Sequence, residues 1–183
     1  MPSTAASAQK PVRPIRVVGD IAFVPLTKGY EAIIDAADVH LVEEHNWCAK
    51  VFHRKDGSIQ TVYAVRSERS GGKQHEIRMH RVLADTPDGM ETDHHDGNGL
   101  NNRQSNLRDA TRSQNQHNQR VRADNSSGAK GVGWDKTKGK WRVRIGLNGK
   151  VRSLGRYTDI NEASAAYAKA SAEFHGKFGR VES

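Results

Sequence analysis

The sequence has 183 residues and a single cysteine, Cys48. One thiol excludes a disulfide framework and any zinc cluster built on several cysteines, and it is typical of a protein in a reducing compartment. No apolar run approaches the roughly 18 residues that a membrane span needs. The N-terminal stretch MPSTAASAQKPVRP lacks the apolar segment of a signal peptide. We therefore expect a cytoplasmic protein, not associated with a membrane, with a disordered tail at residues 1–14.

Acidic residues are scarce in the C-terminal part of the chain. From Arg112 onward, 15 Lys and Arg stand against 6 Asp and Glu, whereas the first 111 residues have 14 and 15. The net charges of the two parts are +9 and −1, so the excess of +8 lies wholly in the second part. A basic part joined to a near-neutral one predicts a polyanionic partner such as nucleic acid. A soluble surface that happens to be basic is the alternative.

The first part of the chain favours β-structure over residues 15–75. The segments WCAKVFHR and IQTVYAVR flank Asp56-Gly57, a dipeptide typical of hairpin turns. The segment AADVHLVEEHN has helical spacing, and SERSGGK is predicted to be a flexible loop.

The middle of the chain predicts a short helix, a strand, a long polar loop, a second strand and a second helix. The first helix is predicted in HEIRMHRVLAD, and the first strand and the polar loop in ETDHHDGNGLNN. The second strand is predicted in NLRDAT and the second helix in RSQNQHNQR. Thr111 and Gln114 have the spacing of a capping box, which places Asn115 in the first turn of the second helix. His117 and Asn118 are expected to face outward on this helix, where they would reach backbone phosphate.

From Ala129 the pattern changes to three short strands and a helix. Lys138-Gly139 and Asn148-Gly149 are predicted turns, and Asp159 is the expected N-cap of the helix. In the strand KWRVRIGL, side chains alternate in direction, so the helix should cover Trp141, Val143 and Ile145. That leaves Arg142 and Arg144 on the open face, joined by Lys130 and Trp134.

Three strands of this size can enter a DNA major groove, where Arg can bind guanine bidentately. The alternative is a solvated face with salt-bridged arginines. The residues expected to contact DNA are Lys130, Trp134, Arg142, Arg144, Lys150 and Arg152, with Arg120 and Arg122 from the preceding basic linker.

This C-terminal text resembles the AP2/ERF DNA-binding domain, especially the short versions fused to phage and mobile-element nucleases. The resemblance covers about 55 residues and includes KGV, GKW, the LG after the third strand, YAKA and FHG. It implies a three-stranded sheet packed on one helix, with the sheet in the major groove. Gly133, Gly146 and Ser153 depart from the basic positions of that family, so its base preference does not transfer.

The loop DHHDGNGLNN, residues 93–102, admits several interpretations. A calcium-binding EF-hand would need oxygen ligands at positions 1, 3 and 5 and Gly at position 6, and neither Asp93 nor Asp96 starts such a register. A structural zinc site needs four N or S ligands, and His94 and His95 point to opposite faces of a strand. A plain polar turn remains the alternative to a reaction centre.

The functional interpretation of this loop is a single divalent-metal site. Asp93 and the amide oxygen of Asn115 suit Mg²⁺, with Mn²⁺ expected to substitute, because Mg²⁺ is often held by one or two protein groups. His94 points the other way and can take a proton from an attacking water. Asn106 begins the return strand, where it can hold the loop across its width and orient His94.

These residues resemble the HNH endonucleases, the ββα-metal nucleases, over about 36 residues. The similar text is HR at His80-Arg81, followed by DHHDGNGLNNRQSNLRDATRSQN. The resemblance implies a metal on Asp93 and Asn115, His94 as general base and Asn106 as its orienting residue. His80, Arg81 and His117 are accessory candidates, with a structural role favoured for His80, and His95 is expected to be a bystander.

The sequence thus predicts an α+β protein. A β-rich region leads into a ββα-metal HNH nuclease core, and a small three-stranded antiparallel sheet packed on one helix follows, in the AP2-like manner. The predicted boundaries are 15–118 for the nuclease domain, with its core at about 76–118, 119–127 for a basic linker and 128–183 for the DNA-binding domain.

The predicted function is a metal-dependent endonuclease acting on double-stranded DNA, of the homing or phage DNA-processing type. A monomer with one active centre should nick, and two molecules would be needed to cut both strands. The alternative is a DNA-binding regulator with an inert HNH fold.

Overall fold

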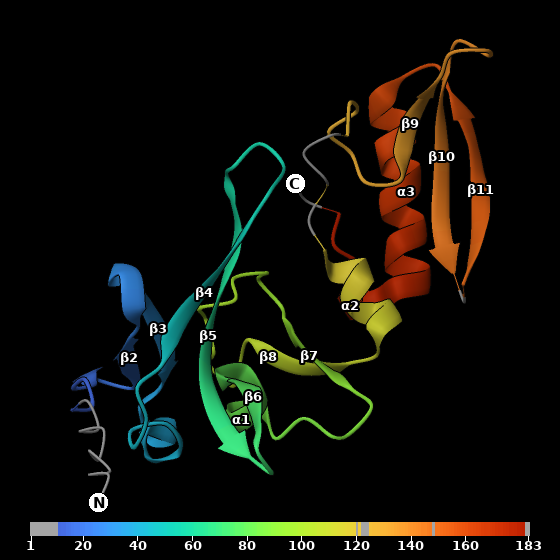
Figure 1. The fold of residues 1–183 in the computed structure, drawn as a ribbon. Helices are drawn as coiled ribbons and strands as arrows, with labels where there is room; N and C mark the ends of the chain where they lie inside the picture. Colours follow the sequence, from blue (N-terminus) through green and yellow to red (C-terminus); the bar gives the residue numbers. More distant parts are fainter. Residues whose placement is uncertain (1–10, 120, 122–124, 148, 182–183) are drawn as a thin grey trace, which may run out of the picture. The chain divides into compact units, whose positions relative to one another are not determined.

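The computed structural model describes residues 11–119, 121, 125–147 and 149–181, which form two compact units (Figure 1). Unit 1 contains the described residues up to Asp85 together with Asn98–Leu107. Unit 2 contains Thr86–Gly97 and the described residues from Arg108 onward. The division therefore passes through the predicted nuclease segment rather than through the predicted linker.

Unit 1 is built from two three-stranded antiparallel sheets. The first has the order β1-β2-β3 and the second β4-β5-β6. The strands are β1 (Arg16–Val18), β2 (Ile21–Pro25), β3 (Glu31–Asp35), β4 (Cys48–His53), β5 (Ile59–Ser70) and β6 (Lys73–Arg78). Two 3₁₀ helices, η1 (Thr27–Gly29) and η2 (Ala36–Leu41), and the helix α1 (Met79–Ala84) complete it.

The core of unit 1 joins both sheets to α1. Its largest fully buried side chains include Trp47, Ile34 and Met79, which come from three distant parts of the chain. The predicted strands and the hairpin turn at Asp56-Gly57 are present. The segment AADVHLVEEHN, which has helical spacing, forms the 3₁₀ helix η2 over Ala36–Leu41 and then turns. One local expectation, the flexible loop at SERSGGK, was wrong. SERSGGK extends β5 and turns at Gly71 and Gly72, whose positive φ angles suit a tight hairpin.

The N-terminal sheet of unit 1 also holds the polar loop. The Ile33 amide donates to the carbonyl of Leu100 at 2.8 Å, and the Asn102 amide donates to the carbonyl of Ile33 at 2.7 Å. Arg103 completes the attachment through ion pairs with Asp35 at 2.7 Å and Asp20 at 2.8 Å. Residues 98–107 thus behave as an additional, irregular edge of the β1-β2-β3 sheet.

Unit 2 contains a two-stranded sheet, a capped helix and a second sheet covered by one helix. The first group is β7 (Glu91–His94), β8 (Leu107–Ala110), which starts at the last residue of unit 1, and α2 (Arg112–Asn118). The second group is β9 (Val132–Asp135), β10 (Lys140–Leu147), β11 (Lys150–Tyr157), α3 (Ile160–His175) and η3 (Gly176–Phe178), with the strand order β11-β10-β9.

Local signals account for these elements. Gln114 N donates to Thr111 Oγ1 at 3.3 Å and Thr111 N donates to Gln114 Oε1 at 2.8 Å, so the predicted capping box is confirmed. The Asp159 carboxylate caps α3 by accepting from the amides of Asn161 and Glu162. The predicted turn at Asn148-Gly149 includes Asn148, which lies outside the described residues.

The described helices include none that is both long and apolar enough to span a membrane.

Replacing Gly99 by Ala tests the attachment of the loop within unit 1. A Cβ atom at Gly99 would lie 2.5 Å from the carbonyl oxygen of Val62 and 2.6 Å from the ring of Tyr63. Because backbone and a packed ring must shift to admit it, we expect Gly99→Ala to lower the free energy of unfolding by about 1–3 kcal/mol. Urea denaturation measures this.

The matched control is Gly146→Ala. A Cβ at Gly146 would meet no atom within 4 Å, and the residue has no positive φ. This variant should therefore be as stable as the parent chain. Equal effects of the two substitutions would contradict the close approach at Gly99.

Candidate metal centre and nucleic-acid interface

Two carboxylate side chains on β7 face two amide side chains on α2. Glu91 and Asp93 are two residues apart on a strand, and Asn115 and Asn118 are three apart on a helix, so each pair shares a face. Asn115 Nδ2 donates to Glu91 Oε2 at 2.6 Å, and Asn118 Nδ2 donates to Asp93 Oδ1 at 2.9 Å. The predicted ligands Asp93 and Asn115 thus lie on facing sides of β7 and α2, each bonded to a partner that was not predicted.

Asp93 is almost fully buried, with 4% of its surface exposed. Its second oxygen, Oδ2, accepts from Arg108 Nε at 2.7 Å, and Arg108 Nη2 lies 2.7 Å from the same atom in an ion pair. Arg108 is in β8, the strand beside β7. A buried carboxylate is costly unless it is paired and hydrogen-bonded. In Asp93, Oδ1 accepts a hydrogen bond and Oδ2 forms an ion pair as well as a hydrogen bond.

The residues present suit a hard divalent cation. A carboxylate offers about four lone-pair positions, so Asp93 can bind a cation while it accepts from Arg108 and Asn118. Asn115 can add its amide oxygen. Throughout the described ranges no three side chains of His, Cys, Asp or Glu gather as a metal cluster. A cation here would therefore depend on few protein groups, as Mg²⁺ commonly does.

His94 lies on the opposite side of β7 from Asp93 and is 5% exposed. Its carbonyl accepts from the amide of Gly97 at 2.8 Å and from Asn118 Nδ2 at 2.8 Å. Asn118 therefore fixes both the Asp93 side chain and the backbone of the next residue. His95 is exposed, and its carbonyl accepts from Arg180 Nη2 at 3.1 Å.

The remaining predicted nuclease residues belong to unit 1. Asn106 Nδ2 donates to the carbonyl of Asn101 at 2.7 Å, which closes the polar loop just before β8 begins. His80 is buried in α1, and its ring meets Tyr63 edge-on with the centroids 5.4 Å apart. This packing fits the structural role favoured for His80. Arg81 is exposed on the same helix.

The outward orientation expected for His117 and Asn118 was wrong. Asn118 is buried against β7, as described above. The His117 ring stacks on His175 at the end of α3, with a centroid distance of 3.6 Å and an interplanar angle of 10°. Burial, the proximity of His175 and the charge of Lys130 hold the pKa of His117 below its ordinary value. Helix α2 is therefore packed on both sides.

Lys130 does not lie on the open face of the second sheet. It precedes β9, and its ammonium donates to the carbonyls of His117 at 2.5 Å and Gln119 at 2.7 Å. A lysine can cap a helix C-terminus in this way. Burial, and to a smaller extent the charge of Arg180, lower the pKa of Lys130 to about 8.

The second sheet has the predicted alternation along β10. Val143 and Ile145 are buried beneath α3, whereas Arg142 and Arg144 point the other way. The strand register shows that the prediction of Trp134 on the open face was wrong. Trp134 pairs directly with Trp141 on the neighbouring strand, and their rings meet edge-on with the centroids 4.9 Å apart. Residues directly opposite in a sheet share a face. Trp134 is therefore on the helix side of the sheet.

The register of β11 separates its basic residues into two groups. Lys150 is opposite Leu147 and Arg152 is opposite Ile145. The Cβ atoms of both basic residues therefore point to the side of the sheet that carries α3. After a bulge, Arg156 is opposite Arg142 and joins the open face, where it donates to Asp135 Oδ2 at 3.0 Å. Arg120 and Arg122 lie outside the described residues.

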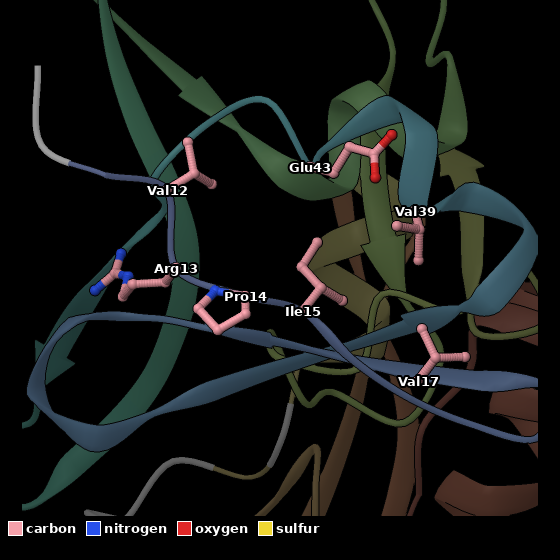
Figure 2. Close-up of a pocket in the computed structure, with 7 residues that line it drawn as sticks. All are labelled: Val12, Arg13, Pro14, Ile15, Val17, Val39 and Glu43. Carbon is pink, nitrogen blue, oxygen red and sulfur yellow. The ribbon is translucent and has the colours of Figure 1, made fainter.

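The pocket drawn in Figure 2 belongs to unit 1 and carries no catalytic constellation. It is lined by Val12, Arg13, Pro14, Ile15, Val17, Val39 and Glu43. Its two charged residues lie on opposite sides of the lining in Figure 2, and Arg13 donates to the carbonyl of Trp47.

Comparison with known proteins relates the middle of the chain to a family of nucleases. Residues 80–117, which include Asp93, His94, Asn106 and Asn115, match the family model described as HNH endonuclease. The chain therefore carries an HNH endonuclease segment, and members of that family generally depend on a divalent metal and act on DNA.

A particular relative is Protein 3.8 of Escherichia phage T7. It is 37% identical over 94 residues, which are 51% of this chain and 77% of that protein. No solved structure matches the chain.

The pH dependence of stability tests the placement of Lys130. Its protonated form is disfavoured in the folded chain, because the pKa is about 8 there against 10.5 in the unfolded chain. The unfolded chain then binds more protons between these values, so this residue makes stability rise from about pH 8 to about pH 10.5. Relative to Lys130→Met, the parent chain should gain free energy of unfolding over this window.

Urea denaturation of both proteins at several pH values measures the difference, which also removes contributions from other titrating groups. A constant difference between the two proteins across the window would show that the ammonium is solvated rather than buried against α2.

Proposed function

We propose that the protein is a divalent-metal-dependent endonuclease that hydrolyses a phosphodiester bond of double-stranded DNA. The observation that carries the proposal is the arrangement of β7 and α2 within the matched segment. The buried Asp93 faces the amides of α2, while the adjacent His94 faces the opposite way. A metal-holding group and a base are thereby kept on separate sides of one strand.

Each residue of this centre has a distinct part in the proposed reaction. Asp93 and Asn115 hold the cation, which when bound stabilises the charge that develops on the phosphate and the departing oxygen. His94 takes the proton of the attacking water, and Asn106 keeps the loop closed through its bond to Asn101. Glu91 orients the Asn115 amide by accepting from its nitrogen, which leaves the oxygen as the ligand atom.

The open face of the second sheet is the proposed DNA-binding surface. Arg142, Arg144 and Arg156 start from this face, and a Cβ at Gly133 or Gly146 would meet no atom within 4 Å. The glycines leave bare backbone beside the arginines, which lets a duplex approach closely. This arrangement supports the AP2-like targeting that the sequence resemblance implies.

Each chain has one candidate metal centre and one proposed DNA-binding sheet. This favours a monomer that nicks one strand in each binding event. Two molecules would be needed to cut both strands. The phage relative is consistent with action on DNA in a bacterial host cell, either as a homing-type enzyme or in phage DNA processing.

Replacing His94 by Ala tests the base. Because general base catalysis contributes about 10²–10⁴-fold, we expect His94→Ala to lower Mg²⁺-dependent cleavage by a factor in this range while DNA affinity changes little. Cleavage of end-labelled duplexes and a gel-shift assay measure the two quantities.

The matched control is His95→Ala, which removes the exposed neighbour and should cleave normally. Equal cleavage by His94→Ala and the parent chain would falsify the base assignment. If the parent chain binds DNA and never cleaves it under any divalent metal, the protein is instead a DNA-binding regulator with an inert HNH fold.

The double substitution of Arg142 and Arg144 by Ala tests the sheet face. Each phosphate contact contributes about 0.9 to the slope of log affinity against log salt, so losing two contacts should flatten the slope by up to about 1.8. Affinity should fall with it, as fluorescence anisotropy over a range of salt concentrations can record.

Lys150 and Arg152 provide the control, since they carry the same charge but start from the other side of the sheet. Their replacement by Ala should change the slope less. An unchanged slope in the Arg142 and Arg144 variant would rule out this face as the binding surface.

A further inference from the structure

The C-terminal segment of the chain reaches the candidate metal centre through Arg108. Besides its contacts with Asp93, Arg108 donates from Nη1 to the carbonyl of Lys177 at 2.6 Å. Its guanidinium also lies over the Phe178 ring, 4.2 Å from the centroid. Both residues belong to η3, directly after α3, and the whole assembly lies within unit 2.

Arg108 is therefore held from two directions. On one side is a carboxylate whose side chain is 5% exposed, and on the other are a backbone carbonyl and the face of a buried aromatic ring. The arginine side chain itself is only 13% exposed. A guanidinium is planar, always charged and able to donate in several directions at once, which a lysine ammonium at this position cannot reproduce.

We propose that Arg108 is a positioning residue that shares the Asp93 carboxylate with the divalent cation, and that Lys177 and Phe178 keep it in place. This role rests on the proposed metal site. Arg108 lies outside the predicted ligand set, and through it the affinity for the metal depends on the C-terminal segment. The two cations repel each other across one carboxylate. Arg108 thus orients Asp93 and at the same time weakens the hold of the site on metal.

The test is Mn²⁺ binding to the full chain, measured by calorimetry or by the electron paramagnetic resonance of free Mn²⁺. Arg108→Gln removes the charge and keeps a side chain that can donate to Asp93. We expect it to bind Mn²⁺ about tenfold more tightly than the parent chain, because a unit charge a few ångströms from the cation is lost. Mere structural damage would weaken Mn²⁺ binding, so the direction of the change separates the two explanations.

Three further variants sharpen the comparison. Arg108→Lys keeps the charge but loses the contacts that hold the guanidinium in place, so it should bind Mn²⁺ less tightly than Arg108→Gln does. Arg66→Gln removes an arginine from a different ion pair, Arg66 with Glu68, and should leave the Mn²⁺ affinity unchanged. Asp93→Asn should abolish binding.

The contribution of the C-terminal segment is tested by Phe178→Ala against Phe174→Ala. Both variants remove one aromatic ring from the C-terminal part, but only Phe178 lies beneath Arg108. Phe178→Ala should tighten Mn²⁺ binding, though less than Arg108→Gln, since a loosened guanidinium competes less well for Asp93. Phe174→Ala should not.

The outcomes distinguish this inference from the proposed function. If Asp93→Asn abolishes Mn²⁺ binding while Arg108→Gln binds as the parent chain or more weakly, the metal site stands and the sharing by Arg108 is refuted. If Asp93→Asn binds as well as the parent chain, the metal assignment itself fails. Equal affinities of Phe178→Ala and Phe174→Ala would refute the dependence on the C-terminal segment.

Discussion

The burial of one carboxylate, that of Asp93, constrains the arrangement of unit 2. A charge removed from water must find compensating partners, and Asp93 finds them on two different elements. Arg108 reaches it from β8 and Asn118 from α2, so its two oxygens link β7 to a second strand and to a helix. Asn118 also binds the carbonyl of His94, which fixes the backbone where the strand ends. Asn118 therefore satisfies part of the charge and also fixes the backbone of the candidate base.

The polar loop contributes residues to both units. Its first residues complete β7, while its later ones attach to β3 through Leu100 and Asn102. Gly99 permits the close approach to β5, and Asn102 is fully buried beside Met79. The β-rich region before the nuclease motif thus supports the later part of the loop.

Much of the local structure could be predicted because its causes are local. The capping box at Thr111, the alternation along β10 and the N-cap at Asp159 each depend on residues a few positions apart. The errors concern side chains whose direction depends on a distant partner. Helix α2 has only seven residues, which is too short for periodicity to identify its buried face, so Asn118 and His117 were placed outside. Trp134 was placed on the wrong side because the strand register is a pairing property.

The sequence alone determined the kind of chemistry: an oxygen-rich loop with a histidine beside a carboxylate, an amide in the next helix and an excess of positive charge at the C-terminus. Those features are carried by residue type and short spacing. The tertiary structure decided which groups meet. In the folded chain Asn115 donates to Glu91, and the ammonium of Lys130 contacts the end of α2. Phe178 packs against Arg108, which lies 70 positions earlier in the chain. Such contacts depend on how packed elements bury their charges together, which no local pattern encodes.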